Sequence, residues 1–137
     1  MHRILSSGGV FGSTIWSKAQ IAEPWNKACS KLDSTFESND AAFSSAWGGC
    51  QDLEQGLKKA GFVDVRSEER EIVMRFESAE AFAEYWLEGG NPALLRWSAN
   101  WKGEKERVRG ELMRIVREEF GNGRIEMVAA SVIGRKV

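Results

Sequence analysis

Two ionisable side chains near the middle of the chain are the first candidates for chemistry. Arg75 and Glu77 stand two residues apart at the end of an extended segment, so their side chains share a face. A carboxyl group enclosed by aromatic rings has a raised pKa and can act as a general acid near neutral pH. We interpret Glu77 as the first candidate acid, Asp40 as the second, and Arg75 as a group that stabilises a developing oxyanion. The alternative interpretation of Arg75 and Glu77 is a solvated ion pair.

Tryptophan is unusually frequent, with six residues beside one tyrosine and one histidine. Rings of this size either fill a core or line a pocket for a flat, apolar small molecule. Trp97 and Trp101 are four residues apart on a predicted helix, so core packing is the alternative for these two. The expected substrate pocket is lined by hydroxyl and aromatic side chains, namely Ser13, Thr14, Trp16, Trp47, Tyr85, Trp86, Trp97 and Trp101.

The other residues that could carry chemistry are few and scattered. His2, Cys29 and Cys50 cannot form a four-ligand zinc site, and the two cysteines allow at most one disulfide. The sequence lacks a P-loop, a G-x-S-x-G nucleophile motif and a G-x-G-x-x-G dinucleotide fingerprint. We therefore predict no metal and no cofactor, and a reaction that depends on holding a flexible substrate in a reactive conformation.

The composition narrows the class of protein. Hydrophobic residues make up 42% of the chain and charged residues 28%, close to the average of globular domains. A net charge of −1 supplies no basic field for a nucleic acid. No apolar segment approaches the roughly 18 residues of a membrane span, and residues 1–11 lack the apolar run of a signal peptide. We expect a cytoplasmic protein that binds neither nucleic acid nor membrane.

Hydrophobic periodicity places the candidate residues on alternating strands and helices. Alternating and β-branched segments predict three strands, at Gly9–Trp16, Phe62–Phe76 and Arg124–Val132. Helical spacing and capping residues predict helices that begin near Glu23, Gln51, Ser78, Pro92 and Gly103. The polar segment Asp33–Ala46 predicts a loop. In a chain of 137 residues this order indicates one α/β domain.

Several segments resemble class I S-adenosylmethionine-dependent methyltransferases. The stretch HRILSSGGVFGSTIW is similar to the fifth strand of that family and its approach, and LKKAGFVDVRSEER is similar to the helix and turn before the sixth strand. FESAEAFAEYW and GRIEMVAASVIGRKV resemble the cap helices and seventh strand of the fungal small-molecule branch. The resemblance implies a truncated Rossmann-like fold with strands five, six and seven, as a single domain over residues 1–137 with cap helices at about 78–120.

The resemblance covers only the back half of the family's domain. The family binds its cofactor through a glycine-rich loop after strand one and an acidic residue ending strand two, and neither is found here. We therefore expect no methyl transfer by this chain alone. Without the neighbouring strand, residues 10–15 would form an open sheet edge. We expect a homodimer, or a complex with a methyltransferase-type chain, to cover it; the alternative is that Asp33–Ala46 folds back over the edge.

Three functions remain as hypotheses. The first is a cofactor-independent cyclase, isomerase or lyase acting on an apolar secondary metabolite, with Glu77, Arg75 and Asp40 as its catalytic residues. The second is a non-catalytic subunit that completes or regulates a methyltransferase supplied by another chain. The third is a module that binds a small ligand without reaction.

Overall fold

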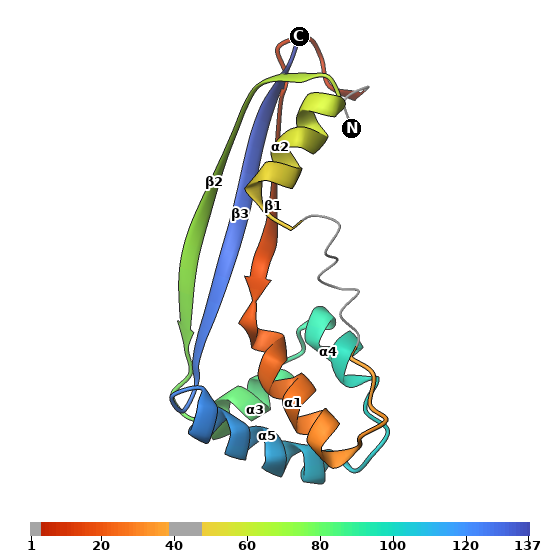
Figure 1. Cartoon of the computed structure of the whole chain (residues 1–137), viewed down its shortest axis with the longest axis vertical. Coiled ribbons are helices and arrows are strands. Elements are labelled where there is room, and N and C mark those ends of the chain that lie inside the picture. Colours follow the sequence, from red (N-terminus) through yellow and green to blue (C-terminus); the bar gives the residue numbers. More distant parts are fainter. Residues whose placement is uncertain (1–3, 39–47) are drawn as a thin grey trace. The chain divides into compact units, whose positions relative to one another are not determined.

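The computed structural model describes residues 4–38 and 48–137, which form an α/β fold with three strands and five α-helices (Figure 1). In chain order they are β1 (Val10–Ala19), α1 (Glu23–Leu32), α2 (Cys50–Lys59), β2 (Phe62–Arg75), α3 (Ala79–Glu88), α4 (Pro92–Ser98), α5 (Lys105–Glu119) and β3 (Arg124–Lys136). A short 3-10 turn, Gln20–Ala22, joins β1 to α1. The predicted α/β class and order of elements are confirmed. Within the described ranges, every helix is too short or too polar to cross a membrane.

Two strands extend beyond their predicted ends. β1 continues to Ala19 rather than ending at Trp16, and β3 continues to Lys136 rather than ending at Val132. The reason is their mutual pairing, which runs over the whole length of β1. Strand length is therefore set by a partner more than a hundred residues away in the sequence, which local periodicity cannot report.

The described residues divide into two compact units. The first contains residues 4–19, 48–72 and 127–137, and the second contains residues 20–38 and 73–126. The sequence led us to expect one domain with cap helices at about 78–120. The helices α3, α4 and α5 of that region all belong to the second unit, together with α1.

The first unit is built on an antiparallel sheet with the strand order β1-β3-β2. Val10 of β1 lies opposite Arg135 of β3, and the register continues to Trp16 opposite Ala129 before a bulge between Trp16 and Lys18. β1 and β2 both run antiparallel to β3, so they point the same way without pairing with each other. Among the described strands, β3 is thus the central one, and β1 lies at an edge.

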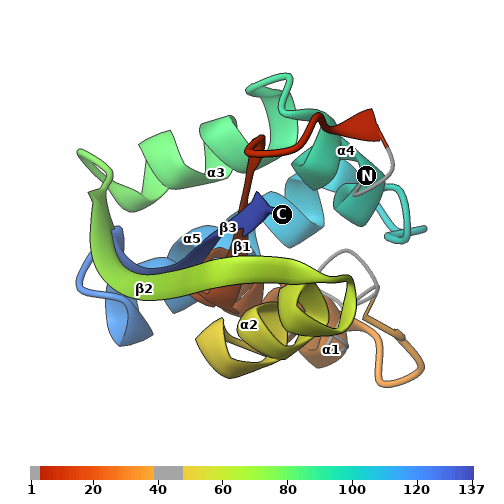
Figure 2. The same cartoon turned by 90° about the horizontal axis from the view of Figure 1, so that it is seen from above.

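Helix α2 covers one face of this sheet (Figure 2). Leu53 packs against Ala130 and Val132 of β3. Four half-buried side chains pack around this cluster, namely Ile15, Cys50, Leu57 and Val65. The approach is close at Gly134, where a Cβ atom would lie 3.0 Å from the Cβ of Phe62 and 3.2 Å from Leu57 Cδ1. Gly61 ends the helix region in the left-handed conformation, with φ +88°. Gly61 therefore allows the chain to leave α2, and Gly134 allows α2 to approach the sheet closely.

The second unit is a helical assembly with an aromatic core. Helix α5 packs against α1 and α3, and α4 packs against α3. The rings of Trp25 and Trp86 are stacked with centroids 5.6 Å apart, and Trp97 lies 6.2 Å from Trp86. All three side chains are buried. Two predicted helix starts are confirmed by their caps, because Ser78 accepts a hydrogen bond from Ala81 N–H (3.2 Å) and Asn91 accepts one from Ala93 N–H (3.0 Å).

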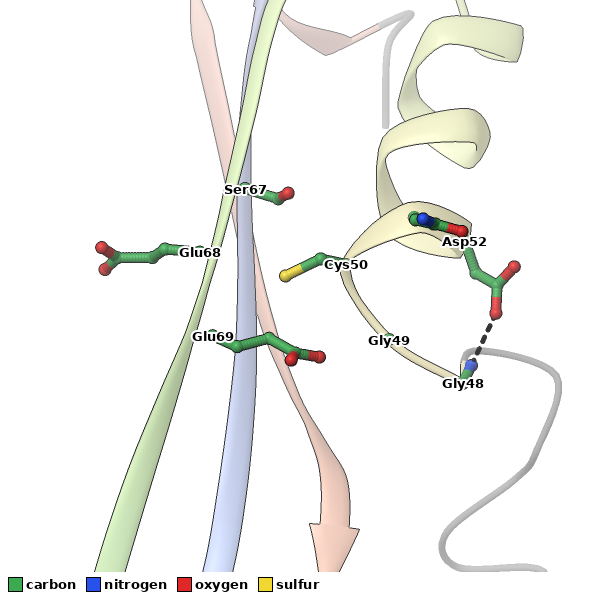
Figure 3. Close-up of a pocket in the computed structure, with 8 residues that line it drawn as sticks. Gly48, Gly49, Cys50, Asp52, Ser67, Glu68 and Glu69 are labelled. Carbon is green, nitrogen blue, oxygen red and sulfur yellow. Dashed lines mark hydrogen bonds between the residues drawn. The ribbon is translucent and has the colours of Figure 1, made fainter.

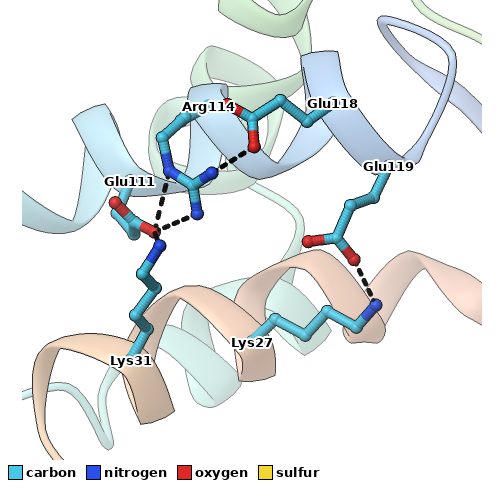
Figure 4. Close-up of polar contacts among 6 residues, drawn as sticks. All are labelled: Lys27, Lys31, Glu111, Arg114, Glu118 and Glu119. Atoms are coloured by element: carbon cyan, nitrogen blue, oxygen red, sulfur yellow. Dashed lines mark hydrogen bonds and ion pairs between the residues drawn. The ribbon is translucent and has the colours of Figure 1, made fainter.

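Ion pairs reinforce the contact between α1 and α5 at the surface of the second unit (Figure 4). Lys27 of α1 pairs with Glu119 of α5 at 2.5 Å, and Lys31 pairs with Glu111 at 3.1 Å. Arg114 also donates to Glu111 (2.6 Å), so that this carboxylate has cations on both helices. Lys27 in addition lies over the ring of Phe120, 5.2 Å from its centroid. The facing surfaces of α1 and α5 thus carry charges of opposite sign outside a buried aromatic core.

Candidate functional site

The predicted pocket residues on β1 lie on opposite faces of the sheet. Ser13 is half-buried on the face that α2 covers, whereas Thr14 and Trp16 are exposed on the other face. The hydroxyl groups of Thr14 and Ser131 of β3 are 3.2 Å apart. The alternation of side chains along a strand therefore separates Ser13 from its two neighbours in the predicted set.

Two of the four predicted aromatic residues of the second unit, Trp86 and Trp97, lie in its core. Trp86 and Trp97 are 0% and 1% exposed, which is the core placement that we weighed as the alternative for Trp97. Tyr85 is half-buried and its hydroxyl accepts a hydrogen bond from the Asn91 side-chain amide (3.3 Å). Trp101 follows α4 rather than lying within it, and its indole N–H donates to Glu104 O (3.2 Å).

The two candidate catalytic residues at the end of β2 are exposed. Arg75 is the last residue of β2, and Glu77 precedes the cap of α3. Phe76 stands between them, with its ring 5.3 Å from Tyr85 and 5.0 Å from Phe82. The pair is thus next to an aromatic cluster and is not enclosed by it. The other predicted residues, Asp40 and Trp47, lie outside the described residues.

A groove of about 630 Å³ lies between the start of α2 and β2 in the first unit (Figure 3). Cys50 and Glu69 point into this space, whereas Glu68 points away from it. Several of the nearby polar groups already have partners: Asp52 accepts from Gly48 N–H (2.9 Å), and Ser67 donates to Glu54 (2.6 Å). The hydrogen bond from the Ser67 hydroxyl lowers the pKa of Glu54, and the hydrogen bond from Lys58 lowers it further. This groove has polar walls rather than the tryptophan walls that the sequence predicted.

The most distinctive unsatisfied surface is the outer edge of β1 with its adjoining face. In the described part of the chain β1 pairs only with β3, so its outer backbone groups have no strand beside them. On the face opposite α2, Val10 is 62% exposed and Trp16 is 42% exposed, and Ile133 of β3 adds a third exposed apolar side chain. An ion pair between Asp64 and Arg135 (2.6 Å) borders this apolar surface.

The resemblance to a truncated domain predicted an open edge at residues 10–15, beside an apolar surface left uncovered by the missing strand. The signal for the face was the alternation of residues 10–16, in which the even positions carry Val10, Thr14 and Trp16. Neither a protein-family model nor a curated protein matches the chain. The function must therefore be argued from the structure and the physical chemistry of its surfaces.

Proposed function

We propose that the chain is a methyltransferase-like subunit that transfers no methyl group itself and acts by docking the outer edge of β1 against a strand of another chain. The observation that supports this is that the outer edge of β1 lacks the features that usually prevent an edge strand from pairing. Natural edge strands are protected by proline, charged side chains or bulges, but residues 10–16 contain no proline and no charged residue. The bulge and Lys18 lie at the far end of the strand.

Strand docking satisfies two needs of this surface at once. A new strand would pair with the outward N–H and C=O groups of β1, and main-chain pairing of this kind supplies much of the affinity in strand addition. It would also cover the flanking side chains of Val10 and Trp16. Exposed apolar groups next to an open edge promote association, so an isolated chain in solution should self-associate.

The experiment measures molecular mass by light scattering over a range of concentrations. The wild-type chain should exceed its monomer mass of 15.3 kDa, and Thr14→Pro should reduce the mass to that value. Proline removes an N–H from the open edge and is tolerated on edge strands. Thr14→Val is the matched control, because it also loses the hydroxyl contact to Ser131 but keeps the backbone donor.

Two results would overturn this proposal. The first is a wild-type chain that stays monomeric, and the second is a Thr14→Pro variant that associates as strongly as Thr14→Val. Circular dichroism on each variant separates loss of docking from loss of folding. A calorimetric titration with S-adenosylmethionine completes the test, since stoichiometric binding by the isolated chain would contradict the absence of methyl transfer.

A cofactor-independent cyclase or isomerase is the second candidate. It is favoured by the position of Arg75 and Glu77 on either side of Phe76, next to the aromatic cluster with Tyr85. Because both charged side chains are exposed, an apolar substrate would itself have to shield them. In this case Arg75→Ala abolishes saturable binding of a flat apolar anion such as anilinonaphthalene sulfonate. In the docking function the same variant leaves the association unchanged.

A further inference from the structure

The backbone groups of β1 that have no strand beside them in residues 4–38 and 48–137 can be assigned from the pairing of β1 with β3. Lys136 N–H donates to Gly9 O (2.8 Å), and the bond back to Lys136 O comes from Gly8 N–H (2.9 Å), so the Gly9 carbonyl faces β3 at the point where the pairing begins. From this carbonyl onward, residues of an antiparallel strand alternate between those that bond to the partner and those that do not, so residues 11, 13 and 15 turn their backbone groups toward β3. The close approach of the Thr14 and Ser131 hydroxyls, at 3.2 Å, agrees with a non-bonded pair at that position. The outward groups therefore belong to Val10, Gly12, Thr14 and Trp16.

We propose that the strand docked on this edge is β1 of a second copy of the chain, antiparallel to the first and related to it by a two-fold axis at Ser13. This rests on the proposed function and specifies the partner and its register. In this arrangement Val10 of each copy lies opposite Trp16 of the other, and Gly12 lies opposite Thr14. All four outward residues then form hydrogen-bonded pairs.

The side chains of β1 complement their own two-fold image on both faces of the sheet. On the open face, the exposed ring of Trp16 meets the exposed Val10 of the other copy, an aromatic and β-branched cross-strand pair. On the face that α2 covers, Phe11 meets Ile15, a second pair of the same kind. Residues 10–17 contain no charge, so the axis brings no like charges together.

Neighbouring registers fit less well. An axis at Thr14 would place Val10 opposite Lys18, which lies beyond the bulge after Trp16. An axis at Gly12 would place Trp16 opposite Gly8, which lies outside β1. The axis at Thr14 would also place Trp16 opposite Gly12, so in both registers the Trp16 ring lies opposite a glycine and has no side chain to pair with. The axis at Ser13 is the register that pairs both ends of the strand.

The test is a disulfide across the axis. Ser13 faces its own copy in a non-bonded pair, where Cα atoms are roughly 4.5 Å apart, within the range of a disulfide. Ser13→Cys, placed in a Cys50→Ser background, should form a covalent dimer under mild oxidation. Thr14→Cys in the same background is the matched control. In this register residue 14 of one copy and residue 14 of the other are diagonal neighbours, roughly 7–8 Å apart. Cross-linking at this position should therefore be at least roughly tenfold slower.

The outcomes separate this inference from the proposed function. Equal cross-linking of Ser13→Cys and Thr14→Cys would overturn the Ser13 axis. If Thr14→Pro abolishes association but Ser13→Cys gives no covalent dimer, β1 docks and this partner register is wrong. If Thr14→Pro leaves association unchanged, the proposed function itself fails. Adding Thr14→Pro to Ser13→Cys should abolish the covalent dimer, which excludes random collision as its source.

Discussion

At the scale of single residues, the two cysteines occupy different environments. Cys29 is fully buried in α1, and desolvation raises the pKa of its thiol to about 12. Cys50 is half-buried at the first turn of α2 and borders the groove beside β2. Both thiols are free. Since the thiolate is the reactive form of cysteine, burial alone should make the two side chains chemically distinguishable.

We expect iodoacetamide at pH 8 to modify Cys50 and to leave Cys29 intact in the folded chain. With a pKa of about 12, the Cys29 thiol is almost wholly protonated at this pH. Mass spectrometry of proteolytic peptides measures the two sites separately. Full denaturation should expose both thiols, and Cys50→Ser should leave the native chain unmodified. Rapid native labelling of Cys29 would contradict the packing around α1.

The tryptophans show how residue type and residue role diverge. Trp86 and Trp97 share the ring chemistry expected of a ligand pocket, but both are enclosed in the second unit with Trp25. Trp16 carries the same side chain and is 42% exposed on β1. A large amphipathic ring stabilises a core and an interface by the same burial of apolar area. Only the position of each ring in the fold decides which use applies.

At the scale of elements, the contact of α1 with α5 includes one half-buried carboxylate at its surface. The side chain of Glu111 is 15% exposed and forms ion pairs with both Arg114 and Lys31. The hydrogen bond from Arg114, followed by that from Lys31, lowers the pKa of Glu111 below its ordinary 4.5. A group whose pKa is lower in the folded state stabilises the fold above the unfolded pKa. That stabilisation is lost as the pH falls through the folded pKa.

We predict that Glu111→Gln reduces the free energy of unfolding at pH 7 by about 0.5–1 kcal/mol. The difference from wild type should shrink as the pH falls from 4.5 through the lower pKa of the folded state, where the wild-type carboxylate also becomes protonated. Urea unfolding at several pH values measures this. Glu84→Gln removes one carboxylate from an exposed site on α3 and serves as control. A difference that stayed constant down to pH 2 would contradict the role of Glu111.

At the scale of the whole molecule, the open edge links stability to concentration. A dimer that dissociates on unfolding is stabilised by mass action. We therefore expect the thermal midpoint of the wild-type chain to rise by roughly 2–5 °C for each tenfold increase in concentration. Differential scanning calorimetry measures this, and Thr14→Pro should show no such dependence. A wild-type midpoint independent of concentration would mean that folding does not depend on β1 pairing between copies.

Much of the secondary structure follows from local sequence. Ser78 and Asn91 supply side-chain acceptors that cap the next helix, and Gly61 supplies the left-handed residue that ends α2. These features involve residues only a few positions apart, so the sequence displays them directly. The same holds for α5, whose buried residues Val108, Leu112, Ile115 and Val116 recur at helical spacing.

The arrangement of these elements is decided by contacts between distant residues. Nothing near Arg124–Lys136 reveals that this strand lies between β1 and β2, because its pairing partners are more than a hundred residues away in β1. The length of β3 follows from that pairing, and the burial of Trp86 follows from its contacts with Trp25 and Trp97, which are also distant in the sequence. Periodicity determines which side of an element is apolar. Only the tertiary structure determines whether another element is available to cover it, and for the edge of β1 in the described chain no strand is.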